Sequence, residues 1–351
     1  MLFSFRSITN LFYTNFIGTI TFGFTLLNIR TMTSSLANGL TFYWMIKHEK
    51  MIYKLISQAN EFHSPLSRSV KTKLKKKITW KLVVLFCLGV LRLIYVHVTS
   101  SQWNIKYYFH SQLYNITMEQ NSRIGKVIIG LDHTCFTFFG LMKLFCIILY
   151  IALCYFIQIK IVQFNDSVES LNNDTFWMRN DKEFLLKQLN KLHSSLIEIL
   201  SQLQTCFAPL TTLWFFDFLI ATFYYIPLVA THFGHKLTAD GISKSIELWF
   251  HLYLMVTLNI AMADINLLIT DKLTTLHLVS VNVEPTNKRE KYYFKLLSEK
   301  IKYPSVQLTG SQYITPSREL LLKAISLLLT YGVLMYQVFP ELFKSKDDWA
   351  G

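Results

Sequence analysis

Apolar residues in this chain gather into long blocks that are separated by polar segments rich in lysine and arginine. Several blocks approach the length of about 20 residues that a helix needs to cross a bilayer. We therefore predict an all-α membrane protein in which residues 1–351 form a single domain of seven transmembrane helices. The predicted spans are 10–29, 33–47, 80–98, 126–158, 208–232, 245–267 and 320–339.

The fourth block, 126–158, is longer than one membrane crossing requires. A helix of this length reaches about 50 Å, whereas the hydrocarbon core is about 30 Å thick. It must therefore tilt strongly or project into solvent at one end. Between the blocks, leucine and isoleucine recur at steps of three and four residues, which predicts amphipathic helices over 182–207 and 288–303. Their apolar faces need a partner, either each other or a neighbouring subunit.

The charge balance changes this picture by giving the helices a direction. Only 16% of the residues are charged, against about 25% in soluble domains, and the net charge is +13. The basic residues lie between apolar blocks, which argues against a nucleic-acid-binding domain. Most fall in the segments 48–79, 159–207 and 268–319, so the positive-inside rule places the N-terminus in the cytoplasm and the C-terminus outside. This orientation disfavours a G-protein-coupled receptor.

The titratable side chains do not form a catalytic or metal-binding pattern. The five cysteines lack CxxC spacing, and the pair His232 and His235 has no nearby carboxylate or cysteine partner. Sequence patterns of zinc proteases, serine hydrolases and phosphate-binding loops are absent. We therefore expect no enzyme activity, no metal site and no cofactor. A secondary transporter of a small solute is the alternative function, although we find no internal repeat of the kind that transporters often show.

The last apolar block carries the most informative motif. Thr330 and Tyr331 are followed by five mostly apolar residues and then by Gln337. This pattern resembles the C-terminal signature of the insect gustatory receptors, a branch of the insect chemoreceptor channels. Tyr331 would be the packing residue of that signature. The signature ends in phenylalanine, whereas this chain has Val338 there and Phe339 one place later.

The resemblance implies a homo- or heterotetrameric, ligand-gated, non-selective cation channel in the plasma membrane of a gustatory neuron, on its dendrite, axon or cell body. The seventh helix would line the pore, and inner helical extensions, including 182–207 and 288–303, would form a cytoplasmic anchor between subunits. The partners would be a small-molecule tastant, membrane lipid and other copies of the chain or related subunits. In the sugar-receptor branch a glutamate commonly follows Thr-Tyr. Here Gly332 follows, so we expect a bitter-type or other non-sugar ligand.

Polar positions along the last block predict which face would line the pore. One helical face carries Thr330, Leu334, Gln337 and Glu341. A polar stripe is better placed toward a water-filled path than toward lipid. We predict that Gln337 and Val338 form the constriction, although Val338 is smaller than the aromatic residue that the family has there. The alternative is that Gln337 hydrogen-bonds a neighbouring helix.

Polar and aromatic side chains are dense in the outer halves of spans three to six, as in a small-molecule pocket. The candidate pocket residues are Arg92, Tyr95, Asp132, His133, Phe136, Tyr224, Tyr225, Glu247, Trp249 and His251. Two alternatives stay open, because tyrosine and tryptophan are enriched at membrane interfaces and because Arg92 and Asp132 could form a structural ion pair. Lys143 and Asp217 lie deeper, and we interpret them as contacts between helices.

Overall fold

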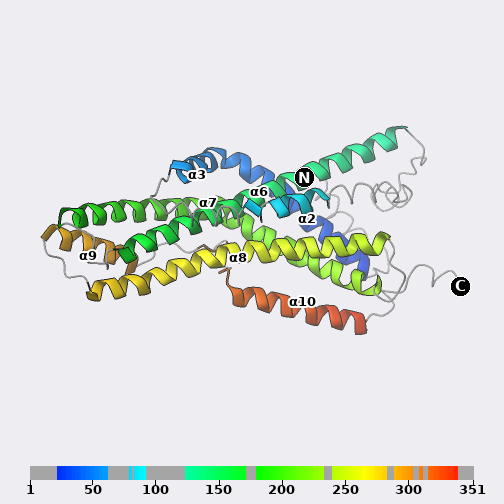
Figure 1. The fold of residues 1–351 in the computed structure, drawn as a ribbon. Coiled ribbons are helices and arrows are strands. Elements are labelled where there is room, and N and C mark those ends of the chain that lie inside the picture. Colours follow the sequence, from blue (N-terminus) through cyan, green and yellow to red (C-terminus); the bar gives the residue numbers. More distant parts are fainter. Residues whose placement is uncertain are drawn as a thin grey trace.

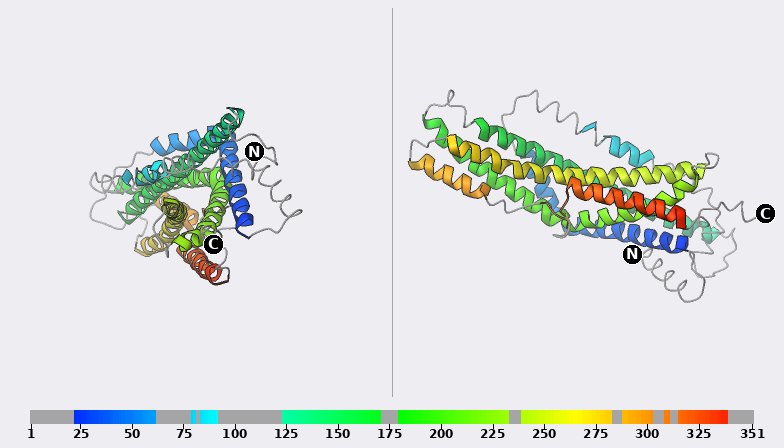
Figure 2. Two further views of the ribbon diagram at one scale, coloured as in Figure 1. Left: turned by 90° about the vertical axis from the view of Figure 1, so that its right-hand side faces the viewer. Right: turned by 90° about the horizontal axis from the view of Figure 1, so that it is seen from below.

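The computed structural model describes residues 22–61, 79–80, 83–91, 123–170, 179–232, 239–282, 288–302, 308–310 and 315–338. Its main elements are the helices α2 (Phe22–Lys47), α3 (Glu49–Glu61), α6 (Arg123–Ser170), α7 (Arg179–His232), α8 (Ala239–Asn282), α9 (Lys288–Lys302) and α10 (Arg318–Val338). They form an elongated bundle in which α6, α7 and α8 run along one another (Figure 1). The short helix α9 packs at one end, whereas α10 and most of α2 lie beside the other half (Figure 2).

The three central helices are much longer than a bilayer is thick. They contain 48, 54 and 44 residues, which corresponds to lengths of about 72, 81 and 66 Å against a hydrocarbon core of about 30 Å. Among the described residues, three stretches are long and apolar enough to cross a membrane, namely Thr137–Val168, Glu183–Val229 and Gly241–Ile269. The chain is thus a multi-pass membrane protein whose central helices continue past the bilayer.

The structure corrects the predicted boundary between the first two spans, 10–29 and 33–47. Helix α2 runs without interruption from Phe22 to Lys47, through the positions that we expected to form a loop. No glycine or proline lies between Gly23 and Gly39, so nothing in the backbone ends the helix there. Arg30, which falls between the two predicted spans and which we counted among the basic residues of the outer side, is buried inside the bundle. Residues 10–21 lie outside the described part of the chain.

The predicted amphipathic segment 182–207 and the predicted span 208–232 form one continuous helix, α7, although Pro209 and Pro227 lie inside it. Proline lacks an N–H group and disturbs the backbone bonding of the preceding turn. The carbonyl oxygen of Cys206, in the turn before Pro209, accepts a hydrogen bond from the Trp44 indole at 2.6 Å. A side chain of α2 thus hydrogen-bonds a backbone carbonyl close to the proline, next to the Thr205 carbonyl that Pro209 leaves without its helical donor.

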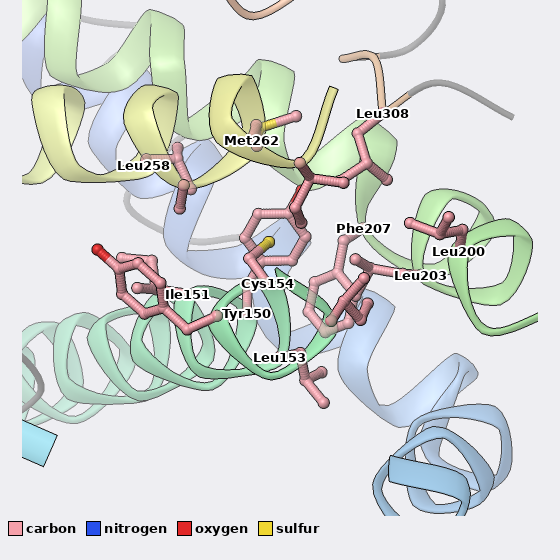
Figure 3. Packing of buried hydrophobic residues seen from close by; sticks show 14 of the residues in the cluster. Tyr150, Ile151, Leu153, Cys154, Leu200, Leu203, Phe207, Leu258, Met262 and Leu308 are labelled. Atoms are coloured by element: carbon pink, nitrogen blue, oxygen red, sulfur yellow. The ribbon is translucent and has the colours of Figure 1, made fainter. Parts of the chain in front are cut away.

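Large side chains from α6 and α7 form the middle of the core (Figure 3). The ring of Tyr150 lies 5.0 Å from that of Phe207 and 6.2 Å from that of Trp214, measured between centroids. Trp214 also donates to the Thr41 hydroxyl at 2.9 Å, which fixes α2 against α7. Leu308, from the connection between α9 and α10, is fully buried in the same cluster. The core therefore holds a non-helical segment as well as the helices.

Candidate functional site

A buried carboxylate joins three helices in the half of the bundle that α10 covers. Asp217 on α7 is 1% exposed. Its Oδ1 accepts a hydrogen bond from Arg30 Nη1 on α2 at 3.3 Å, and its Oδ2 accepts one from Lys143 Nζ on α6 at 2.8 Å. A buried charge is tolerated only when it is paired and hydrogen-bonded. Lys143 and Asp217 therefore do form the contact between helices that we inferred from their positions.

Arg30 also connects the cluster to α8. Its Nη2 lies 3.0 Å from His251 Nε2. A guanidinium group can only donate, so His251 Nε2 must accept, and the proton of the neutral ring sits on Nδ1. Nδ1 then donates to the backbone carbonyl of Glu247 at 2.7 Å. The carboxylate of Glu247 is buried too, with Oε2 3.6 Å from the same ring nitrogen.

Aromatic rings enclose this polar cluster. The centroid of the Tyr225 ring lies 5.8 Å from that of His251 and 5.9 Å from Arg30 Cζ. Tyr224 packs edge-on against Tyr225 at 5.0 Å. The rings of Phe218 and Phe250 also pack edge-on against the His251 ring, at centroid distances of 6.1 and 5.7 Å. Aromatic walls around a few fixed polar groups are the chemistry that small-molecule sites use.

The structure brings together four of the ten predicted pocket residues, namely Tyr224, Tyr225, Glu247 and His251. It does not bring Trp249 to them, because that side chain is 67% exposed. Glu247 and His251 are one helical turn apart and share a face, whereas Trp249 lies between them on the opposite face of α8. Arg92 and Tyr95 lie outside the described residues. Asp132, His133 and Phe136 belong to α6, but their side chains are outside the described part of the structure.

Arg30 is the member of the cluster that the sequence interpretation missed, since we assigned it to a loop. One available signal was the absence of any glycine or proline around it. Another was the cost of an unpaired carboxylate at Asp217 inside an apolar block, which requires a cation on a neighbouring helix. Lys143 was a visible candidate for that cation, and a second one was not expected.

Helix α10 packs on α7 and α8 along one face only. Leu321 and Leu328 are buried on that face, and Tyr331 contacts the Phe223 ring edge-on at a centroid distance of 4.6 Å. Gly332 is also buried there, so close to Ile226 that a Cβ atom would overlap its side chain. The residue that departs from the sugar-receptor pattern is therefore a point where α10 approaches α7 too closely for a side chain.

The opposite face of α10 is polar and exposed. It carries Glu319, Lys323, Ser326, Thr330 and Gln337, which are all exposed, together with Leu334 at 51% exposure. Thr330 Oγ1 donates to the Ser326 carbonyl at 2.9 Å, and Lys323 Nζ lies 2.6 Å from Glu319 Oε1. That bond lowers the pKa of the Glu319 carboxyl, which precedes the predicted span. Glu341 lies outside the described residues, as does the side chain of Val338.

Two further features bear on possible ligands. A small pocket lies where α7, α8 and the connection to α10 meet, and it is lined by Thr211, Thr212, Phe215, Leu258, Asn259, Met262, Gly310 and Pro316. Within the described ranges, no three His, Cys, Asp or Glu side chains gather closely enough to hold a metal ion.

Comparison with known proteins identifies the architecture. No family model and no curated protein matches the sequence. The solved structure of the insect olfactory receptor OR5 from Machilis hrabei has a TM-score of 0.68 and 13% identity, covering 96% of this chain and 86% of that one. The same receptor in complex with eugenol gives a TM-score of 0.70 and 14% identity over the same shares. The chain therefore has the fold of an insect olfactory receptor.

Proposed function

We propose that this chain is a subunit of a ligand-gated, non-selective cation channel of the gustatory type, which detects a small non-sugar molecule at the plasma membrane. The observation that carries the proposal is the polar, exposed stripe of α10, which lies opposite the face that packs on the bundle. Polar groups facing lipid are unfavourable, so this stripe needs water or another subunit beside it. A central pore between several copies of the chain would provide both.

In a tetramer around such a pore, each chain would contribute the same stripe. Thr330 and Gln337 would offer oxygen atoms to a passing cation, and Gln337 with Val338 would form the narrowest part. Leu334, between them, would add an apolar ring. Glu341 would lie near the outer end, where a carboxylate raises the local concentration of cations.

The long ends of the central helices support assembly into such a tetramer. One end of each of the helices α6, α7 and α8 lies at the end of the bundle where α9 packs (Figure 1). Helix α9 presents exposed Tyr292 among charged residues, and Glu290 is buried against the bundle. An amphipathic surface of this kind suits contacts between subunits in solvent.

The ligand would bind near the cluster around His251 and Tyr225. Within the described residues, this is where charged and polar groups from four helices meet aromatic rings. Arg92, Tyr95, Asp132, His133 and Phe136 are the further residues that we expect to line it. The Thr330, Tyr331 and Gln337 motif favours a gustatory over an olfactory role, and Gly332 favours a non-sugar ligand.

Cysteine accessibility tests the pore assignment. In cells that express the chain and carry a ligand-evoked or basal cation current, a charged, water-soluble thiol reagent should block Thr330→Cys and Gln337→Cys. Leu328→Cys is the matched control, because Leu328 is on the same helix but 2% exposed on the face against the bundle. Wild type controls for the native cysteines. Block of Leu328→Cys alone, or of none of the variants, would refute the assignment.

A calcium-imaging screen separates the channel from the transporter alternative. The chain would be expressed alone in cells that lack endogenous receptors and exposed to a panel of bitter compounds, sugars and eugenol. A channel gives rapid cation entry that does not depend on coupling proteins, with single-channel steps in patch recordings. Saturable solute uptake without such steps would favour a transporter.

A further inference from the structure

Two side-chain amides hold the segment that leads into α10. Gln204 on α7 accepts the Thr309 backbone N–H at 3.0 Å and donates to the Thr309 carbonyl at 2.9 Å and to its hydroxyl at 2.7 Å. Asn266 on α8 accepts the Leu308 N–H at 2.9 Å and donates to the Leu308 carbonyl at 3.0 Å. Each amide thus pairs both backbone polar groups of one residue, as a neighbouring β-strand would.

This pairing solves a local problem of the fold. Residues 308–310 are not helical, so they do not bond their own backbone groups, and Leu308 and Gly310 are buried. Unpaired backbone groups in such a place are strongly unfavourable. The two amides, which come from two different helices, satisfy the backbone groups of Leu308 and Thr309 and fix these residues in position. We call residues 308–310, Gln204 and Asn266 the amide clamp.

The start of α10 is fixed to the same two helices. Arg318 Nη2 lies 3.2 Å from Asp264 Oδ1 on α8. Ser317 caps the helix, because its hydroxyl accepts the Leu320 N–H at 3.0 Å. Pro316 is buried beside Gly310 at the small pocket between α7 and α8. The clamp and the first turn of α10 are therefore attached to the same pair of helices, α7 and α8.

We propose that Gln204 and Asn266 are positioning residues that transmit displacements of α7 and α8 to α10. The geometry favours this role because neighbouring residues of one short segment are bonded to different helices. A sliding of α7 past α8 would pull Thr309 and Leu308 in different directions, and the segment would have to reorient the start of α10. The functional meaning of this movement rests on the proposed pore role of α10.

Hydrogen exchange on the purified full-length protein in nanodiscs tests the proposal without any ligand. The variants are Gln204→Ala, Asn266→Ala and their combination, with Gln204→Glu as a milder change that keeps the bond to the Thr309 N–H. Gln158→Ala is the matched control, because Gln158 Nε2 donates to the Ala261 carbonyl at 2.9 Å, and the substitution so removes a bond between α6 and α8 that is not one of the clamp bonds. We expect exchange of the 308–310 amides to rise about tenfold or more in the clamp variants.

The hydrogen-exchange rate at the start of α10 decides whether the proposal holds. The proposal requires faster exchange in 318–325 as well, in the clamp variants and not in Gln158→Ala. Faster exchange confined to 308–310 would overturn it, since the amides would then only stabilise their own segment. An equal rise in the control would also overturn it. If α10 responds but wild type carries no cation current, the proposed channel function fails while the mechanical link stands.

Discussion

Replacing Asp217 by asparagine is the most direct perturbation of the buried cluster. The substitution keeps the shape of the side chain and removes the negative charge that Arg30 and Lys143 share at 3.3 and 2.8 Å. Asparagine can still accept a hydrogen bond from one of the two cations. Both cations would stay buried, with side chains only 9% and 10% exposed, and the carboxylate that compensates them would be gone.

The expected loss of stability is large. Removing one partner of a buried ion pair destabilises a protein by about 3–5 kcal/mol, because it leaves a charge without compensation. The unfolding entropy of a chain of 351 residues is about 0.7 kcal/mol per kelvin. A loss of about 4 kcal/mol should therefore lower the melting temperature by about 5 °C. Thermal unfolding of the purified protein in detergent, followed by intrinsic fluorescence, measures this shift.

A second substitution tests whether the loss of Lys143 changes stability in opposite directions with and without Asp217. Lys143→Met should destabilise wild type, because Asp217 loses its closest cation. In the Asp217→Asn background the same change should stabilise, because it removes an ammonium group that has lost its carboxylate. The coupling energy from this double-mutant cycle isolates the pair. Additive losses in both backgrounds would refute the reasoning and show that other groups hold Lys143 in place.

Two further substitutions test contacts of the site and of α10. His251→Gln should be nearly neutral, because an amide can accept from Arg30 while donating to the Glu247 carbonyl. His251→Leu should destabilise by about 1–3 kcal/mol, because it leaves the Arg30 bond without an acceptor. Equal melting temperatures for the two variants would contradict a stabilising role for the hydrogen bonds of His251. Gly332→Ala should destabilise by about 1–2 kcal/mol, the balance of overlap with Ile226 and better helix propensity. Gly332→Ala should become neutral or stabilising in an Ile226→Ala background. Thermal unfolding of wild type, the two single variants and the double variant measures this. If Gly332→Ala destabilises both backgrounds equally, a contact other than Ile226 limits the packing.

Helix α10 shows what periodicity can predict. The positions 330, 334 and 337 share a face by spacing alone, and the exposed side chains of Thr330, Leu334 and Gln337 lie on one face in the structure. Spacing could not show that this face points away from the bundle. That orientation depends on Leu321 and Leu328, whose burial is decided by contacts with α7 and α8.

Arg30 shows why the neighbours of a residue in the sequence do not always predict its environment in the fold. A charged residue in an apolar block normally marks a loop, because an unpaired charge is expensive in a membrane. Here the partners of Arg30 are Asp217 and His251, which lie 187 and 221 positions later in the sequence. A rule that uses neighbouring residues cannot detect such compensation. The amide clamp could not be predicted for the same reason, because Gln204 and Thr309 are 105 positions apart in the sequence.

Helix α7 is the element that the buried cluster and α10 share. Asp217 and Tyr225 face the cluster, whereas Phe223 and Ile226 face α10 and contact Tyr331 and Gly332. Both sets of contacts fall within three turns of one helix, and a rigid helix cannot shift one set without shifting the other. The clamp residue Gln204 belongs to the same helix, nearer its start. A displacement of α7 at the cluster would therefore reach α10 at two points, directly through its buried face and through the segment that precedes it.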